Sequence, residues 1–142
     1  MNKMRQHAPY LAGPLVNLKG IIDSTKKALR QVNFEGFVGT GLSGTMVVPA
    51  LAYVMEKRFA IVRKPDDRGH HSSGTVESGL RHDDRWIFID DFISSGATLA
   101  RVISCMTSHS CDATYIGRYL YNDVLHCYFP QSAAEVPWTP EV

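Results

Sequence analysis

Two adjacent carboxylates, Asp90 and Asp91, separate a short apolar run from a run of small hydroxyl and glycine residues. The apolar run 86–89 predicts a buried strand, and the apolar spacing over 99–106 predicts a helix. The segment Ser-Ser-Gly-Ala-Thr at 94–98 therefore leads into a helix N-terminus, which favours anions such as phosphate. Two carboxylates would repel a bare phosphate. The pattern favours a phosphate ligand that also carries hydroxyls, a metal ion or a developing positive charge, as ribose 5-phosphate can.

The thirteen residues 86–98 resemble the signature with which type I phosphoribosyltransferases bind 5-phosphoribosyl-1-pyrophosphate (PRPP): a hydrophobic strand, two acids and a Thr/Ser/Gly loop. The resemblance implies that Asp90 and Asp91 are catalytic and hold the ribose 2- and 3-hydroxyls. It implies a loop for the 5-phosphate made of Ser94, Ser95, Gly96, Ala97 and Thr98. An ordinary strand end with a solvated acidic turn and a serine N-cap is the alternative interpretation.

The composition describes an ordinary globular protein. With 142 residues, 44% hydrophobic and 20% charged, we expect one domain over 1–142 with its core at about 17–130. A net charge of +1 argues against a nucleic-acid surface, and no apolar run is long enough to span a bilayer. Three cysteines without metal-ligand spacing, and no secretory signal in 1–13, favour a cytoplasmic protein.

Strand and helix patterns alternate along the chain. They predict helices at 17–31 and 45–57, a helix after the acidic loop, and strands at 34–38, 59–62, 86–89 and 114–121. This alternation predicts an α/β fold of three layers, a parallel sheet with helices on both faces. Ligands bind beyond the carboxyl ends of such strands, where the glycine turn 39–44, Arg63–Lys64 and the acidic loop should meet. Few terminal residues are left for the family's hood over the base, so the hood should be minimal.

The glycine turn 39–44 spells G-x-G-x-x-G, the fingerprint of dinucleotide-binding proteins. That fingerprint expects an acid at the end of the second strand, where this chain has Arg63 and Lys64, although an arginine can accommodate an NADP phosphate. The chain is also short for a dinucleotide fold with a substrate domain. The family resemblance implies instead a pyrophosphate loop formed by Thr40, Gly41, Leu42, Ser43 and Gly44. A purely structural turn is the third interpretation.

The polar segment 65–84 predicts a mobile lid or a solvated linker. Arg63–Lys64 at a strand end, then a loop with Arg68 and His70, resembles the orotate branch of the family. Cations there would neutralise the departing pyrophosphate, so we assign Arg68 and His70 as catalytic and Arg63 and Lys64 as substrate-binding. The loop lysine of that branch is absent, and His70 is about one residue out of register.

Two observations in the sequence bear on the identity of the base. Ser94 stands where the hypoxanthine-guanine branch has an aspartate, which argues against that branch. The aromatic residues Tyr119, Tyr121 and Trp138 can stack on a base, but we favour a core role for them.

The resulting hypothesis is a Mg²⁺-dependent transfer of ribose 5-phosphate from PRPP to a nucleobase, with an orotate-like pyrimidine favoured and pyrophosphate released. Mg²⁺ would be held by PRPP and water near Asp90 and Asp91, not directly by the protein. The resemblance also implies a homodimer. The alternatives are a non-catalytic PRPP- or nucleotide-binding regulator, a purine phosphoribosyltransferase and a small NADP-binding domain.

Overall fold

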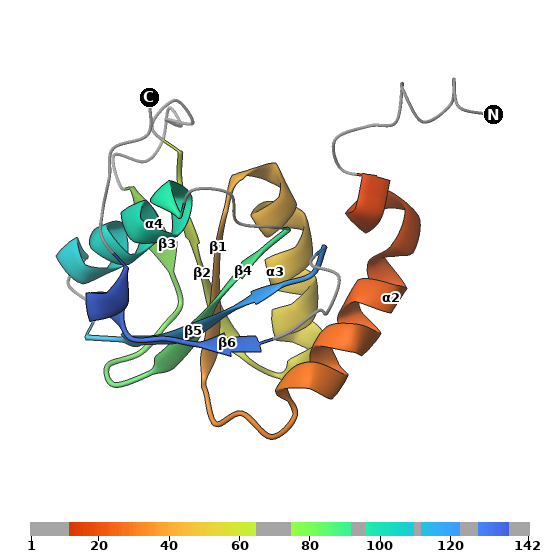
Figure 1. Ribbon diagram of the computed structural model, residues 1–142, viewed down its shortest axis with the longest axis horizontal. Coiled ribbons are helices and arrows are strands. Elements are labelled where there is room, and N and C mark those ends of the chain that lie inside the picture. Colours follow the sequence, from red (N-terminus) through yellow and green to blue (C-terminus); the bar gives the residue numbers. More distant parts are fainter. Residues whose placement is uncertain (1–11, 65–74, 92–95, 110–111, 123–127, 137–142) are drawn as a thin grey trace.

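A six-stranded sheet in the order β3-β2-β1-β4-β5-β6 forms the middle layer of the molecule (Figure 1). The computed structural model describes residues 12–64, 75–91, 96–109, 112–122 and 128–136. The strands are β1 (Gly36–Thr40), β2 (Arg58–Val62), β3 (Val76–Ser78), β4 (Arg85–Asp90), β5 (Thr114–Leu120) and β6 (Tyr128–Pro130). The helices are α2 (Ala12–Leu29), α3 (Gly41–Met55) and α4 (Ala97–Ser108), followed by the 3-10 turn η1 (Ala133–Glu135).

The predicted α/β fold with helices on both faces is confirmed, but the sheet is mixed, not wholly parallel. The four central strands β2, β1, β4 and β5 run parallel to one another. The two outer strands are antiparallel, β3 to β2 and β6 to β5. Both antiparallel strands are three residues long and lie at the edges of the sheet. Such short segments show no periodicity of their own, and they become strands because a neighbour offers unpaired backbone groups.

The two faces of the sheet are buried under different helices. Helices α2 and α3 cover one face and α4 the other (Figure 1). Phe37 of β1 belongs to the core cluster under α2 and α3, and the next residue, Val38, belongs to the cluster under α4. A strand buried on both faces reads as a continuous apolar run, which explains why the central strands were recognisable in the sequence. Tyr119 and Tyr121 are fully buried, so their predicted core role is confirmed.

The glycine-rich segment is not a separate turn, because β1 runs directly into α3. The helix begins at Gly41, four residues before the predicted start, and Pro49 lies in its interior. The absence of side chains at Gly39 and Gly44 allows this close packing. A Cβ on Gly39 would lie 2.7 Å from Cγ2 of Val48, and one on Gly44 would lie 3.1 Å from the carbonyl carbon of Gly39. Two glycines of the fingerprint therefore have a packing role.

Helix α2 begins earlier than predicted but breaks at the predicted start. Asn17 has a non-helical backbone (φ −141°, ψ 46°) inside the range Ala12–Leu29. Its Oδ1 accepts a hydrogen bond of 3.2 Å from the N–H of Gly20, as an N-cap does. The second part of the helix therefore starts where the apolar spacing indicated.

The second half of the predicted lid 65–84 is part of the fold. Residues 76–78 form β3, Val76 is buried and Leu80 packs against the core under α4, so 75–84 belong to the folded domain. The remaining part of that range, 65–74, lies outside the described residues. A mobile lid stays a prediction for that part alone.

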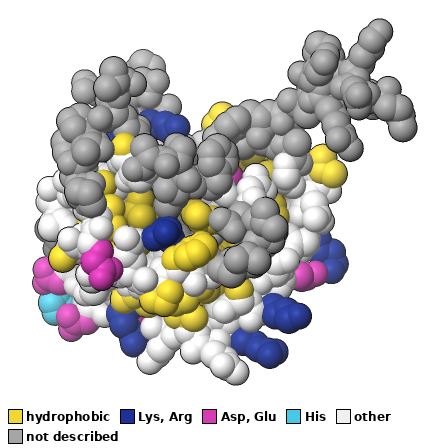
Figure 2. All heavy atoms as spheres, viewed as in Figure 1, with side chains coloured by type: hydrophobic (Ala, Val, Ile, Leu, Met, Phe, Trp, Pro, Cys, Tyr) yellow, Lys and Arg dark blue, Asp and Glu magenta, His cyan; other side chains and the backbone are white. Residues whose placement is uncertain are grey.

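The face shown in Figure 2 carries hydrophobic side chains across its middle and charged groups of both signs mainly around its lower rim. No large field of one sign is visible among its described residues, in keeping with the net charge of +1.

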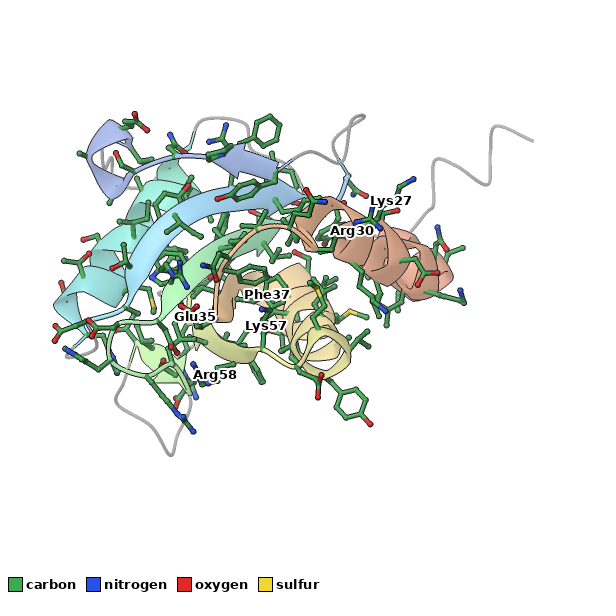
Figure 3. All side chains as sticks on the ribbon, turned by 90° about the horizontal axis from the view of Figure 1, so that it is seen from below. Lys27, Arg30, Glu35, Phe37, Lys57 and Arg58 are labelled. Atoms are coloured by element: carbon green, nitrogen blue, oxygen red, sulfur yellow. The ribbon has the colours of Figure 1, made fainter. Side chains whose placement is uncertain are left out.

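Ion pairs connect residues at the amino-terminal ends of the strands, at the opposite end of the sheet from the acidic loop. Asp84, which is 4% exposed, accepts hydrogen bonds from Nε and Nη2 of Arg58 at 2.7 and 2.6 Å. The Arg58 guanidinium holds the pKa of Asp84 below its ordinary value. Glu35 forms a second pair with Arg85. Figure 3, viewed from below, shows Glu35 and Arg58 at the starts of their strands.

We expect Asp84→Asn to lower the free energy of unfolding by about 1–3 kcal/mol, because it removes charge-assisted hydrogen bonds from a buried group. Chemical denaturation followed by circular dichroism measures this change. Asp83→Asn is the matched control, since Asp83 is the exposed neighbour and its replacement should stay within about 0.5 kcal/mol. Equal effects of the two substitutions would contradict the structural role of the pair.

Candidate functional site

The carboxyl ends of β1, β2 and β4 meet at one edge of the sheet, as the sequence predicted. These strands are parallel, and α3 begins at that edge directly after Thr40 (Figure 1). Lys64 follows the end of β2, and Asp90 and Asp91 lie at the end of β4. The edge therefore joins three of the predicted site segments.

The N-terminus of α3 is left without a side-chain cap. Thr40 occupies the N-cap position in an extended conformation, but its hydroxyl donates to the carbonyl of Val62 at 2.6 Å. Gly41 has a left-handed φ of +70°, and the first turn contains no acidic residue. The first N–H groups of a helix have no intrahelical acceptor. Leu42 and the two glycines have no side-chain donor and Ser43 is buried, so backbone N–H groups are the donors that this segment offers to an anion.

Lys64 extends over this helix N-terminus. A Cβ built on Gly41 would lie 3.0 Å from Cε and 3.4 Å from Nζ of Lys64. The Lys64 charge also acts on Asp90, where it lowers the pKa. Lys64 therefore lies against the expected pyrophosphate segment, close enough to the acidic pair for its charge to act on Asp90. Arg63 instead pairs with Glu77 of β3, with Nη2 and Oε2 3.0 Å apart.

The backbone of the acidic pair is fixed by hydrogen bonds to the residues after β5. The carbonyls of Asp90 and Asp91 accept the N–H groups of Tyr121 and Asn122 at 3.0 and 2.9 Å, and the N–H of Asp91 donates to Oδ1 of Asp90 at 2.8 Å. Burial and the hydrogen bond from the Asp91 side chain raise the pKa of Asp90 to about 7. Two neighbouring carboxyls in a confined place resist carrying two charges. A ligand that offers hydroxyls or positive charge would favour the doubly ionised form.

The expected 5-phosphate loop is described only from Gly96 onward. Gly96 precedes α4 with a φ of +82°, a conformation that favours glycine, and nothing lies within 4 Å of the position a Cβ would take. Ala97 is buried and Thr98 is half-buried in the first turn of the helix. Ser94 and Ser95, together with Arg68, His70 and Trp138, lie outside the described residues.

Arg101 is a residue of this site that the sequence analysis did not identify. It lies in α4, is 7% exposed, and donates hydrogen bonds from Nη2 to the hydroxyl of Thr40 at 3.2 Å and from Nη1 to the carbonyl of Arg63 at 3.1 Å. By helical spacing Arg101 lies away from Leu99 and Ile103, so the sequence pattern would place it in solvent. No local signal marks it as buried.

The raised pKa of Asp90 predicts how stability depends on pH. The folded protein holds the Asp90 proton up to about pH 7, whereas an unfolded aspartate loses it near pH 3.8. The free energy of unfolding should therefore fall as the pH rises from 3.8 to about 7 and level off above that pH. We expect Asp90→Asn to remove this fall and to be more stable than the native protein at pH 8. Melting temperatures from pH 5 to 8 measure it, with Asp83→Asn as the control. Parallel curves for Asp90→Asn and the native protein would contradict the assignment.

No protein-family model matches the chain. Over 107 residues it is 26% identical to an adenine phosphoribosyltransferase of Mycoplasma capricolum, covering 63% of each protein. The chain thus spans less than two thirds of the length of the curated relatives it matches.

Solved structures have the same fold. An adenine phosphoribosyltransferase from Thermoanaerobacter pseudethanolicus matches with a TM-score of 0.59 and 18% identity, over 77% of this chain and 72% of that one. An orotate phosphoribosyltransferase from Francisella tularensis matches with a TM-score of 0.53 and 19% identity, over 72% and 50%.

The fold is therefore that of the type I phosphoribosyltransferases. The resemblance to this family that the signature segment indicated is confirmed. The matched sequences are adenine enzymes and the matched structures include adenine and orotate enzymes, so they do not single out the orotate branch.

Within the described ranges, no helix has the length and apolar character needed to cross a membrane. Nor does that part of the chain bring together three or more His, Cys, Asp or Glu side chains that could hold a metal ion.

Proposed function

We propose that this protein transfers ribose 5-phosphate from PRPP to a nucleobase and releases pyrophosphate. The observation that carries the proposal is the meeting of the uncapped α3 N-terminus, Lys64 and the acidic pair at one edge of the sheet. An anion site beside two carboxylates suits a ligand with phosphates at one end and a hydroxyl-bearing ring at the other. PRPP has both.

In the proposed reaction, the bond between the anomeric carbon and the pyrophosphate oxygen breaks, and its electron pair leaves with pyrophosphate. A ring nitrogen of the base forms the new bond to that carbon, and the proton of its N–H is released to the solvent. Asp90 and Asp91 bind the ribose hydroxyls and stabilise the positive charge that develops on the ring. The backbone N–H groups at the start of α3 and the Lys64 ammonium stabilise the charge that develops on the leaving group.

Magnesium fits this arrangement as a partner of the substrate. Mg²⁺ prefers oxygen ligands and is commonly bound by one or two carboxylates together with substrate phosphates. Here PRPP oxygens and water would hold the ion near Asp90 and Asp91, without a direct bond to the protein. The bound ion would neutralise part of the pyrophosphate charge.

For the base we propose adenine in preference to orotate. The curated relatives are adenine phosphoribosyltransferases. The sequence argument for orotate included Arg63, and that side chain pairs with Glu77. The homodimer and the cytoplasmic location implied by the resemblance also stay proposals.

The test is to mix the protein with Mg²⁺ and PRPP and then with adenine, orotate, hypoxanthine or guanine in turn, measuring pyrophosphate release and the nucleotide formed. We expect release with adenine. Product from orotate alone would restore the pyrimidine hypothesis. Calorimetric binding of PRPP without release for any base would favour the regulator. Thermal protection by NADP but not by PRPP would favour the dinucleotide-binding alternative.

A further inference from the structure

Arg101 carries a buried positive charge, and its hydrogen-bond acceptors among the described residues are neutral. It is 7% exposed, and its two hydrogen bonds go to a hydroxyl and a backbone carbonyl. Its Nε is buried without a hydrogen-bond partner. None of the ion pairs among the described residues includes this guanidinium. A buried ion without an opposite charge is costly, so its retention calls for a compensating role.

The guanidinium contacts the ends of the two strands that lead into the proposed pyrophosphate site. One hydrogen bond reaches Thr40, the N-cap of α3, and the other reaches the backbone of Arg63, which precedes Lys64. Arg101 therefore joins the ends of β1 and β2 from a third element, α4. A shift of either end would move the α3 N-terminus relative to the Lys64 ammonium.

The contact with Thr40 also explains why α3 lacks a side-chain cap. The Thr40 hydroxyl donates to the carbonyl of Val62 and accepts from Arg101, so both of its roles are in use within the sheet edge. A threonine at an N-cap ordinarily accepts from a backbone N–H of the first helical turn. With the hydroxyl held elsewhere, those N–H groups remain available to an anion.

We propose that Arg101 is a positioning residue for pyrophosphate. It holds Thr40 and the end of β2 in the anion-binding arrangement, and its charge is compensated by the anion bound above it. The inference rests on the proposed function, because it needs pyrophosphate at the start of α3. The inference predicts different effects on the two halves of PRPP. Pyrophosphate would lie at the start of α3, next to the contacts of Arg101, whereas ribose 5-phosphate would lie at the acidic pair and the start of α4.

The experiment compares Arg101→Met and Arg101→Lys with the native protein by calorimetry, using Mg²⁺-pyrophosphate and ribose 5-phosphate as separate probes. We expect Arg101→Met to weaken pyrophosphate binding about tenfold or more and to change ribose 5-phosphate binding less than about twofold. Arg101→Lys keeps the charge but not the fork of donors, so its pyrophosphate affinity should be intermediate. If Arg101→Met does not fold, Arg101→Lys alone tests the inference, which then requires a weaker affinity for pyrophosphate and an unchanged affinity for ribose 5-phosphate.

Arg118→Met is the matched control. Arg118 also has a buried Nε without a hydrogen-bond partner, but it lies in β5 and contacts Gln131 and the ring of Phe129. Its replacement should leave both affinities unchanged. Equal weakening of both probes by Arg101→Met, or no weakening of either, would overturn the inference while the native protein still binds pyrophosphate. Failure of the native protein to bind pyrophosphate would overturn the proposed function as well.

Discussion

The double variant Asp90→Asn/Asp91→Asn is expected to lose phosphoribosyl transfer by roughly a hundredfold or more while it stays folded. Stabilisation of a developing charge by one oriented group is often worth about 2–4 kcal/mol, and here both carboxylates are lost. The amides occupy nearly the same volume. Because burial already favours the protonated form of Asp90, neutral side chains should be tolerated.

Initial rates of pyrophosphate release at saturating PRPP measure this loss, and circular dichroism checks the fold. Asp112→Asn serves as the control, because Asp112 is exposed and precedes β5 at the opposite end of the strand from Tyr121. Turnover of the double variant close to that of the control would exclude the acidic pair from the reaction.

Lys64→Met is expected to lower kcat/KM for PRPP by about tenfold to a hundredfold. Its ammonium lies over the start of α3, where the leaving pyrophosphate gains charge in the proposed reaction. Lys64 is exposed, so the replacement should not disturb the core. Lys27→Met is the control, since Lys27 lies on α2 (Figure 3) and is also exposed.

The pH dependence of kcat/KM for transfer also tests how Lys64 and Asp91 act on Asp90. Lys64 lowers the pKa of Asp90, so Lys64→Met should move the acid limb of kcat/KM to higher pH. Asp91 raises that pKa, so Asp91→Asn should move the limb to lower pH. Shifts in the same direction for both variants would show that Asp90 does not set the acid limb.

The sequence by itself determined the central elements and the acidic pair. The buried strands β1, β2, β4 and β5 read as short apolar runs, and α4 shows the spacing of an amphipathic helix, because each pattern follows from local geometry. The two acids at the end of an apolar run do lie at the carboxyl ends of the parallel strands, where the sequence predicted them, and their role as a site stays a prediction.

The tertiary structure decided what depends on distant parts of the chain. The strands β3 and β6 exist because β2 and β5 offer them an edge, and α3 starts at Gly41 because two glycines let it pack on β1. Arg101 lies on the side of α4 where spacing predicts solvent. It is buried because its hydrogen-bond partners, 61 and 38 residues away in sequence, are brought against it by the parallel order of the strands. Periodicity reports a residue's position on its own element, whereas burial of a charge depends on what other elements place beside it.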